Sequence, residues 1–271
     1  SARQVDRRRI DLRRQCRPVM RPLLEIAANS LSSALAAQDG GADRVELCAD
    51  LSAGGTTPSC GTIAITRDRL RIPLYVLIRP RTGDFCYDAR EIDVMLRDIE
   101  NCASAGCDGV VIGALDTSGD VDATVCRNLI AAAGSLGVTF HRAFDAARDQ
   151  TSALETIIEF GCERVLTSGG AANALAGAVR IAAFVEQAGA RLRVMAGAGL
   201  DSSNIREVAE RSHVRELHAS ARGMRLSPTS HRNDRLPELS ADWWETDGRI
   251  VRAMLDALPR AEQQKKILTG M

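Results

Sequence analysis

The chain has 271 residues, of which 45% are hydrophobic and 26% charged, and its 35 basic and 35 acidic side chains leave no net charge. This composition is typical of a folded globular protein and excludes a chain that is disordered throughout, and the length is close to the ~250 residues of a (β/α)8 barrel. The charge balance and the low aromatic content of 3% disfavour nucleic-acid binding, because nucleic acids are held by a basic surplus and by aromatic stacking.

Residues 1–21 form an arginine-rich segment with eight arginines and two acidic residues. We interpret it as a flexible basic leader, with a targeting peptide or an anion contact as the alternatives. No apolar run reaches the roughly 18 residues that span a bilayer, and the first residues contain no apolar signal-peptide region. We therefore expect a cytoplasmic protein without a membrane partner, whose eight scattered cysteines stay reduced.

After residue 22, short apolar runs alternate with longer segments of helical pattern. We expect strands at 23–28, 44–49, 74–80, 109–115, 138–144, 164–169, 191–199 and 215–222. We expect helices at 31–39, 59–70, 89–105, 122–133, 151–160, 172–188, 203–211 and 247–258. The repeat of about thirty residues is the size of a βα unit, and eight units predict an α/β fold, a single TIM-like (β/α)8 barrel over residues 22–258.

Two features lie outside this regular repeat. The segment 223–246 after the eighth strand contains both tryptophans, Trp243 and Trp244, and is either a lid over the barrel mouth, an arm that contacts another subunit, or a segment packed on the barrel's own helices. Residues 259–271 are expected to form a C-terminal tail. An open Rossmann-like sheet is the alternative fold, but the glycine-rich motif it requires after the first strand is absent at 29–32.

Polar residues gather where the predicted strands end, which is where barrels of this kind carry their sites. Four of them can transfer protons, and we take them as candidate catalytic residues: Glu25, Glu46, His141 and His218. Charged groups inside apolar strands are costly unless they are paired or face a wet cavity. The alternative to a ligand site is therefore a structural network of ion pairs that fills the barrel.

A second group of residues is suited to binding an anion, through guanidinium groups, hydroxyls and the backbone of glycine turns. The candidate anion-binding residues are Arg79, Arg81, Ser168, Gly197, Gly199 and Ser220, and the residues expected to support them are Asp84, Arg142, Asp145 and Arg222. The strands are apolar on both faces, so the pattern alone leaves open whether the side chains at the strand ends face the barrel axis or the helices.

Cys48 is the candidate metal ligand, because it lies two residues after Glu46 on the same face of its strand. Copper(I) prefers thiolate and thioether sulfur, and no second sulfur shares this motif. A small packed side chain is the alternative interpretation of Cys48.

Several motifs run in order along about 200 residues: GGADRVELC at 40–48, LSAGGTTPS at 51–59, LIRPRTGDF at 77–85, VTFHRAFD at 138–145, ERVLTSG at 163–169, MAGAG at 195–199 and ELHASAR at 216–222. In this combination the chain resembles the CutC family of copper homeostasis proteins. The resemblance implies a TIM-like barrel, a cytoplasmic homo-oligomer (a dimer or tetramer), the polar residues named above as the family's shared positions, and copper(I) as the metal to be handled.

The chain departs from the family pattern where the resemblance implies copper-binding thiols. The strand-1 position is Ala27 and the position after His218 is Ala219, so that Cys48 alone remains. The leading hypothesis is a copper homeostasis protein that binds a metal or a small molecule. The alternative is an enzyme that acts on a small phosphorylated, carboxylated or sugar-like substrate at the barrel mouth, and a purely structural oligomeric scaffold is the third possibility; whether the protein is an enzyme stays open here.

Overall fold

The computed structural model describes residues 21–232, 235 and 240–259. Within them, Pro22–Leu258 form one compact unit. The leader expected at 1–21 and the tail expected at 259–271 lie outside the described residues, except for Arg21 and Pro259. The homo-oligomer inferred from the resemblance stays a prediction.

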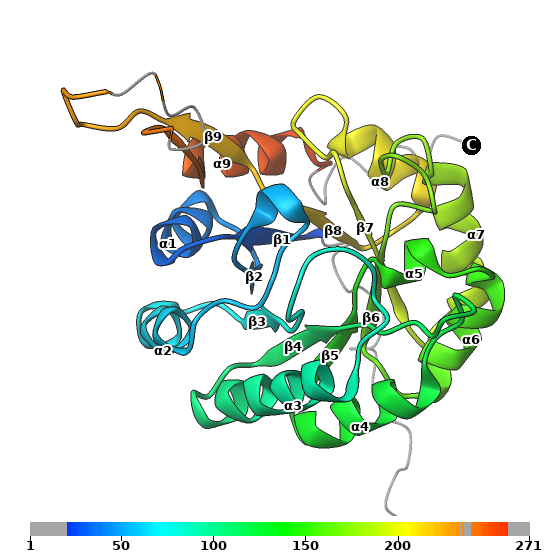
Figure 1. The fold of residues 1–271 in the computed structure, drawn as a ribbon. Helices are drawn as coiled ribbons and strands as arrows, with labels where there is room; N and C mark the ends of the chain where they lie inside the picture. The colour runs from blue at the N-terminus through cyan, green and yellow to red at the C-terminus, as the bar shows by residue number, and fades with distance from the viewer. Residues whose placement is uncertain (1–20, 233–234, 236–239, 260–271) are drawn as a thin grey trace, which may run out of the picture. The chain divides into compact units, whose positions relative to one another are not determined.

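Eight parallel strands close into a barrel in which each strand pairs with the next along the chain and β8 returns to β1. The strands are β1 Leu23–Ala28, β2 Arg44–Leu47, β3 Leu74–Leu77, β4 Gly109–Ile112, β5 Gly137–Phe140, β6 Arg164–Thr167, β7 Arg193–Gly197 and β8 Glu216–Ala219. The helices are α1 Leu31–Gly40, α2 Cys60–Arg69, α3 Ala89–Ser104, α4 Ala123–Ala133, α5 Ala143–Ala146, α6 Gln150–Glu159, α7 Ala178–Ala188, α8 Ile205–Ser212 and α9 Gly248–Ala257. The helices surround the strands (Figure 1), and the predicted TIM-like barrel is confirmed.

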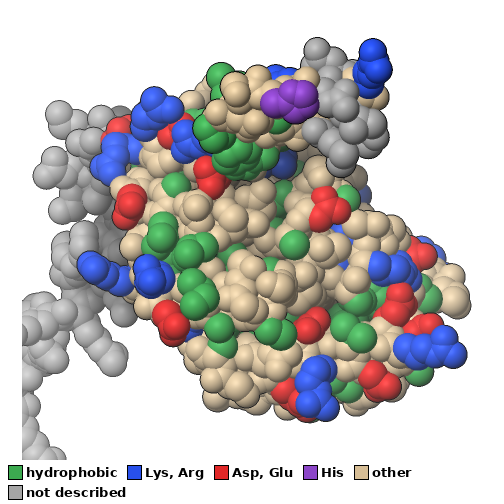
Figure 2. Space-filling view, turned by 60° about the vertical axis from the view of Figure 1, so that its left-hand side comes forward, with side chains coloured by type: hydrophobic (Ala, Val, Ile, Leu, Met, Phe, Trp, Pro, Cys, Tyr) green, Lys and Arg blue, Asp and Glu red, His purple; other side chains and the backbone are tan. Residues whose placement is uncertain are grey.

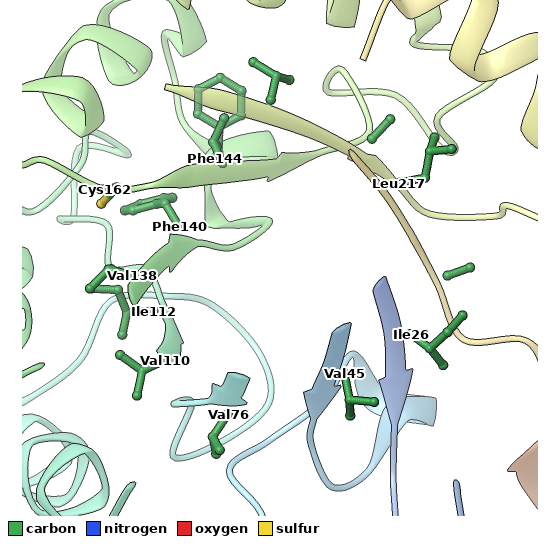
Figure 3. Close-up of a cluster of buried hydrophobic side chains, with 14 of the residues drawn as sticks. Ile26, Val45, Val76, Val110, Ile112, Val138, Phe140, Phe144, Cys162 and Leu217 are labelled. Atoms are coloured by element: carbon green, nitrogen blue, oxygen red, sulfur yellow. The ribbon is translucent and has the colours of Figure 1, made fainter. Parts of the chain in front are cut away.

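The largest apolar cluster lies between the strands and the helices and includes alternate strand residues such as Val76 and Val110 (Figure 3). The residues between them along the strands face the barrel axis, where Cys48, Tyr75, Leu77 and Val111 form a separate, smaller cluster. Neighbouring residues along a strand point to opposite faces. The two clusters therefore show which strand residues face the barrel axis and which face the helices, which the sequence left open.

Tyr75 occupies the lower part of the barrel interior, at the end where the strands begin, and two glycines make room for it. A Cβ atom at Gly109 or Gly137 would overlap the tyrosine ring or its hydroxyl. The hydroxyl donates to Glu163 Oε2 at 2.7 Å. The guanidinium groups of Arg44 and Arg164 lie over the ring, 5.2 and 4.8 Å from its centre, in cation–π contacts.

Some predicted boundaries need correction. The strand expected at 138–144 ends at Phe140, because the chain turns there into the short helix α5, so His141 and Arg142 follow the strand rather than lie in it. The helix expected at 172–188 begins only at Ala178, after a tight turn in which Gly177 packs directly on the Ser168 carbonyl.

The strand expected at 215–222 also ends early, at Ala219, and Arg222 begins a separate hairpin. This hairpin pairs β9 Arg222–Arg225 antiparallel with β10 Trp243–Thr246, within the segment 223–246. It attaches to the barrel at Asn29, whose side chain donates to the Trp244 carbonyl at 3.1 Å. Trp243 and Trp244 remain 46% and 51% exposed, and Figure 2, in which the hairpin lies near the top, shows hydrophobic side chains gathered there.

We predict that Gly109→Ala destabilises the barrel by about 3 kcal/mol, because the added methyl group overlaps a buried, hydrogen-bonded Tyr75 ring that has no room to move. Urea unfolding measures this. Gly61→Ala is the matched control: its new Cβ would lie 4.0 Å from the nearest side-chain atom in the first turn of α2, so a neutral or slightly stabilising effect is expected. Equal stability of the two variants would contradict the packing described here.

Candidate functional site

Two buried carboxylates and a half-buried imidazole, from three adjacent strands, contact one another in a row inside the barrel. His218 on β8 shares register with Glu25 on β1, and Ala27 on β1 pairs with Glu46 on β2. The His218 ring bridges the two carboxylates, with Nδ1 2.8 Å from Glu25 Oε1 and Nε2 3.4 Å from Glu46 Oε2. Room for the ring comes from Gly197 on β7, where a Cβ atom would lie 3.1 Å from the His218 Cβ.

The three groups differ in protonation because their surroundings differ. Burial opposes the charge of Glu25, but the Arg44 guanidinium and His218 outweigh burial and hold its pKa at about 2. Burial raises the pKa of Glu46 to about 7; the charge of His218 opposes this rise and that of Glu25 adds to it. Burial lowers the pKa of His218, yet the carboxylates of Glu46 and Glu25 prevail and raise it. The carboxylates thus favour the charged form of the ring, which lies between the ionised Glu25 and the titrating Glu46.

Above this row, at the end of the barrel where the strands finish, lies a cavity of about 240 Å³. Its lining residues lie on five strands (β2, β3, β5, β6 and β8) or in the loops that follow them. They are Glu46, Cys48, Leu51, Ala53, Gly54, Gly55, Leu77, Arg79, Phe85, His141, Arg142, Leu166 and His218. The structure thus places both predicted histidines on the wall of one cavity, facing the barrel axis, with Glu25 bonded to one of them from below.

His141 offers the cavity a hydrogen bond that no described residue accepts. Burial and the charge of Arg79 lower the pKa of His141 to about 3, so the ring is neutral. Its Nδ1 accepts from the Ala143 N–H at 3.1 Å, which leaves the ring proton on Nε2. Nε2 is buried and has no partner among the described residues. A buried donor without a partner is destabilising, and an acceptor atom on a ligand in the cavity would satisfy it.

Arg79 is a buried cation on the same wall, only 6% exposed. Its Nη1 donates to the Gly55 carbonyl at 3.0 Å and its Nη2 to the Gly83 carbonyl at 2.7 Å, and the Phe85 ring lies 4.9 Å from the guanidinium carbon. No ion pair to Arg79 occurs within residues 21–232 and 240–259. Carbonyls fix its position, and no carboxylate of the described residues neutralises its charge.

Other predicted residues lie elsewhere. Arg81 was expected to bind an anion together with Arg79, and this is not what the structure shows: its side chain turns away to pair with Asp84 at 3.0 Å and Glu91 at 2.5 Å. Neither Arg81 nor Asp84 lines the cavity. Arg79 and Arg81 lie two residues apart beyond the end of β3, where strand alternation no longer governs direction.

Asp145 organises the cavity's far wall. Its carboxylate pairs with Arg142 at 2.8 Å and accepts from Thr167 and Ser168, and Arg142 also donates to the Ser168 hydroxyl at 2.9 Å. Gly197, Gly199, Ser168, Ser220 and Arg222 are not among the cavity-lining residues. Ser168 thus positions Arg142 instead of facing the cavity.

The sequence reasoning missed the residues that support the site from beneath. Arg44 pairs with Glu25 and, at 2.7 Å, with Glu216, which also pairs with Arg164 at 3.1 Å. These residues lie two positions from the predicted ones on the same strands. Had the sequence shown which face of each strand points inward, they would have been predicted as well. Phe85 and Leu166, the apolar part of the wall, carried no signal that separated them from core residues.

The donor atoms of this site suit metal ions that prefer oxygen and nitrogen ligands better than they suit copper(I). Glu25, Glu46 and His218 each offer a ligand atom within 4.8 Å of the others, a hard or borderline donor set. Among the described residues, Cys48 supplies the only sulfur on the cavity wall. Its thiol donates to the Ala28 carbonyl at 3.6 Å, and burial raises its pKa well above the usual value. A protonated lone thiol does not fit a tight copper(I) site.

None of the helices in the described part of the chain is long and apolar enough to cross a membrane.

Comparisons with known proteins agree with this architecture. The sequence profile of the CutC family matches residues 22–223. A CutC family protein from Xanthomonas axonopodis pv. citri is 55% identical over 238 residues, which cover 88% of this chain and 99% of that protein. One from Chromobacterium violaceum is 50% identical over 247 residues, 89% of this chain and all of that protein.

Among solved structures, a proposed copper homeostasis protein CutC from Streptococcus agalactiae superposes with a TM-score of 0.71. It is 30% identical and covers 73% of this chain and 98% of its own. The hairpin residues beyond 223 lie outside the family match.

We predict that Glu46→Gln makes the protein more stable relative to wild type as pH rises. The folded wild type keeps Glu46 protonated up to about pH 7, whereas the unfolded chain releases that proton near pH 4.5. Wild-type stability is therefore lost across this window, by roughly 3 kcal/mol, and glutamine removes the loss.

Urea unfolding at the two ends of this pH window measures the difference. Glu186→Gln, which removes an exposed carboxylate from α7, controls for the general effect of the substitution. If the difference in unfolding free energy between wild type and Glu46→Gln is the same at both pH values, the raised pKa assigned to Glu46 is contradicted.

Proposed function

The chain belongs to the CutC family, and we propose that its barrel-mouth cavity binds a small anionic substrate and performs acid–base chemistry on it. Family membership supports a role in copper homeostasis. The proposed acid–base activity would contribute to that role, and it does not require a copper ion bound tightly in the cavity.

Two buried donors carry this proposal. The Arg79 guanidinium and the His141 Nε2–H line the cavity, and neither has an anionic partner in the described part of the chain. A phosphate or carboxylate group would satisfy both at once. Either chemistry fits, and a cavity of about 240 Å³ limits the ligand to a small molecule.

The acid–base group is Glu46. Its pKa of about 7 means that both the acid and its conjugate base are populated at neutral pH, which is the condition for efficient proton transfer. His218 contacts Glu46 and is held by Glu25, whose charge Arg44 fixes from below. The arrangement allows His218 to support either protonation state of Glu46 while the substrate's acidic group is held by Arg79 and His141, which follow β3 and β5.

Copper(I) binding in the same cavity is the second candidate, favoured by the position of Cys48 on the cavity wall. Copper(I) would arrive there as cargo and meet one sulfur together with oxygen and nitrogen donors. Because the thiol must lose its proton and Ala27 offers no second sulfur, we expect weak binding.

For the anion site, we predict that Arg79→Ala weakens the binding of inorganic phosphate and of acetate by roughly 10- to 100-fold, the value of a charge-assisted hydrogen bond of about 1.5–3 kcal/mol. Isothermal titration calorimetry with each probe separately shows which acidic group the site prefers. Arg81→Ala is the matched control, because its guanidinium is used by Asp84 and Glu91 outside the cavity.

The catalytic part is tested with a panel of small phosphorylated and carboxylated sugars, first for thermal stabilisation and then for turnover by proton NMR. Turnover should vanish in Glu46→Gln and persist in Arg81→Ala. The anion site is rejected if Arg79→Ala binds phosphate and acetate as tightly as wild type does. The buried charged residues would then form a purely structural network.

For copper, we predict that Cys48→Ala removes a weakly held equivalent of copper(I), measured anaerobically against a weak competing chelator. Cys126→Ala is the control, since its buried thiol donates to the Ala114 carbonyl outside the barrel interior. Unchanged stoichiometry in Cys48→Ala would remove this thiol from consideration.

A further inference from the structure

Arg142 is the second guanidinium on the wall of the barrel-mouth cavity, and its charge is balanced in a different way from that of Arg79. It directly follows β5 and lines the cavity, with a side chain that is 43% exposed. Its Nε donates to Asp145 Oδ2 at 2.8 Å, and its Nη2 donates to the Ser168 hydroxyl at 2.9 Å. These two hydrogen bonds fix the plane of the guanidinium group.

Asp145 is itself held firmly by the loop that follows β6. Its Oδ1 accepts from the Thr167 hydroxyl at 2.5 Å and from the Gly170 N–H at 3.0 Å. Its Oδ2 accepts from the Ser168 N–H at 2.9 Å. Gly169 and Gly170 have φ values of +74° and +67°, which curl the loop around the carboxylate. The barrel itself therefore sets the position of the Arg142 guanidinium, before any ligand arrives.

One edge of this guanidinium group is left without a partner. The Nη1 atom of Arg142 makes no hydrogen bond to any residue that the structure describes. A guanidinium carries five N–H donors, and Asp145 and Ser168 use two of them. Donors that are already fixed in place cost a ligand little side-chain entropy. Arg142 thus offers the cavity preorganised donors for an acidic group.

We propose that Arg142 binds a second acidic group, so that the ligand of this cavity is a small molecule with two acidic groups. The inference rests on the proposed function, in which Arg79 and the His141 Nε2–H hold the first group. Carboxylate and phosphate both match a guanidinium edge. The substrate class is therefore a short dicarboxylate or a phosphorylated carboxylate.

The remaining wall suits the middle of such a molecule. Leu77, Phe85 and Leu166 give the cavity apolar surface, against which a short carbon chain can pack. Glu46 and His218, in contact with each other at 3.4 Å, line the same cavity. The acid–base pair would then act on the part of the substrate that joins its two acidic groups.

Asp145 limits how much the second acidic group adds to the affinity. Its carboxylate already neutralises the Arg142 guanidinium, whereas no carboxylate of the described residues neutralises Arg79. The second group is therefore held by oriented hydrogen bonds more than by net charge. We expect it to tighten binding by about 10-fold, which is near the lower end of the range for hydrogen bonds to charged groups.

The test compares ligands that differ only by a carboxylate in place of a methyl group, using isothermal titration calorimetry. The pairs are butyrate with succinate, pentanoate with glutarate, and ethyl phosphate with phosphoglycolate. In wild type, at least one diacid should bind about 10-fold more tightly than its monoacid partner. Arg142→Ala should abolish this gain and leave the monoacid affinities within about 2-fold of wild type, which also shows that the variant is folded.

Two further variants exclude indirect effects. Arg148→Ala also breaks an arginine–aspartate pair, with Asp120 at 2.5 Å, but neither residue lines the cavity, so the gain should persist. Arg142→Ala leaves Asp145 without its cation, and this carboxylate could repel a diacid. The double variant Arg142→Ala with Asp145→Ala removes it, and we expect the gain to stay absent.

The inference is overturned if no diacid binds wild type more tightly than its partner, if Arg142→Ala keeps the gain, or if the double variant restores it. These results leave the proposed anion site intact as long as the monoacids bind and Arg79→Ala weakens them. If wild type binds neither monoacids nor diacids, both the proposed function and this inference are rejected.

Discussion

The buried charge of Glu25 is the constraint on which the interior of the barrel depends. A carboxylate that is 1% exposed is stable only if cations surround it. Arg44 meets it from below and His218 from above. Because Arg44 also reaches Glu216, the lower network extends across the barrel to Arg164, and one fixed charge organises both the floor of the barrel and the base of the cavity.

This constraint separates two neighbouring carboxylates by function. Glu25 receives the Arg44 guanidinium directly and stays ionised, whereas Glu46 is also buried, has no guanidinium partner among the described residues, and titrates near neutral pH. Two acids on adjacent strands whose surroundings push their pKa values apart are the usual arrangement of an acid–base site. A network that served only to fill the barrel would gain nothing from leaving Arg79 Nε and His141 Nε2 without partners beside a cavity.

The sequence was sufficient for the barrel and for part of the site, for reasons that individual residues make clear. Eight apolar runs at βα spacing define the strands, and Glu25, Glu46 and His218 lie within them, so the closure of the barrel brings them together. Arg81 could not be placed this way, because its direction depends on contacts with Asp84 and Glu91 beyond the strand end. The β9–β10 hairpin was missed because its strands are short and separated by a long segment, which leaves no local turn signal.

The cysteines of this chain are better understood from local backbone geometry than from their number. Thiols are missing from the barrel mouth at Ala27 and Ala219, and burial keeps the remaining one, Cys48, protonated. At the other end, in the turn that ends α3, the Cys107 N–H donates to the Cys102 carbonyl, and both cysteine side chains are buried. The mouth, which offers oxygen, nitrogen and cationic groups, therefore suits an anion or a hard or borderline metal ion better than copper(I).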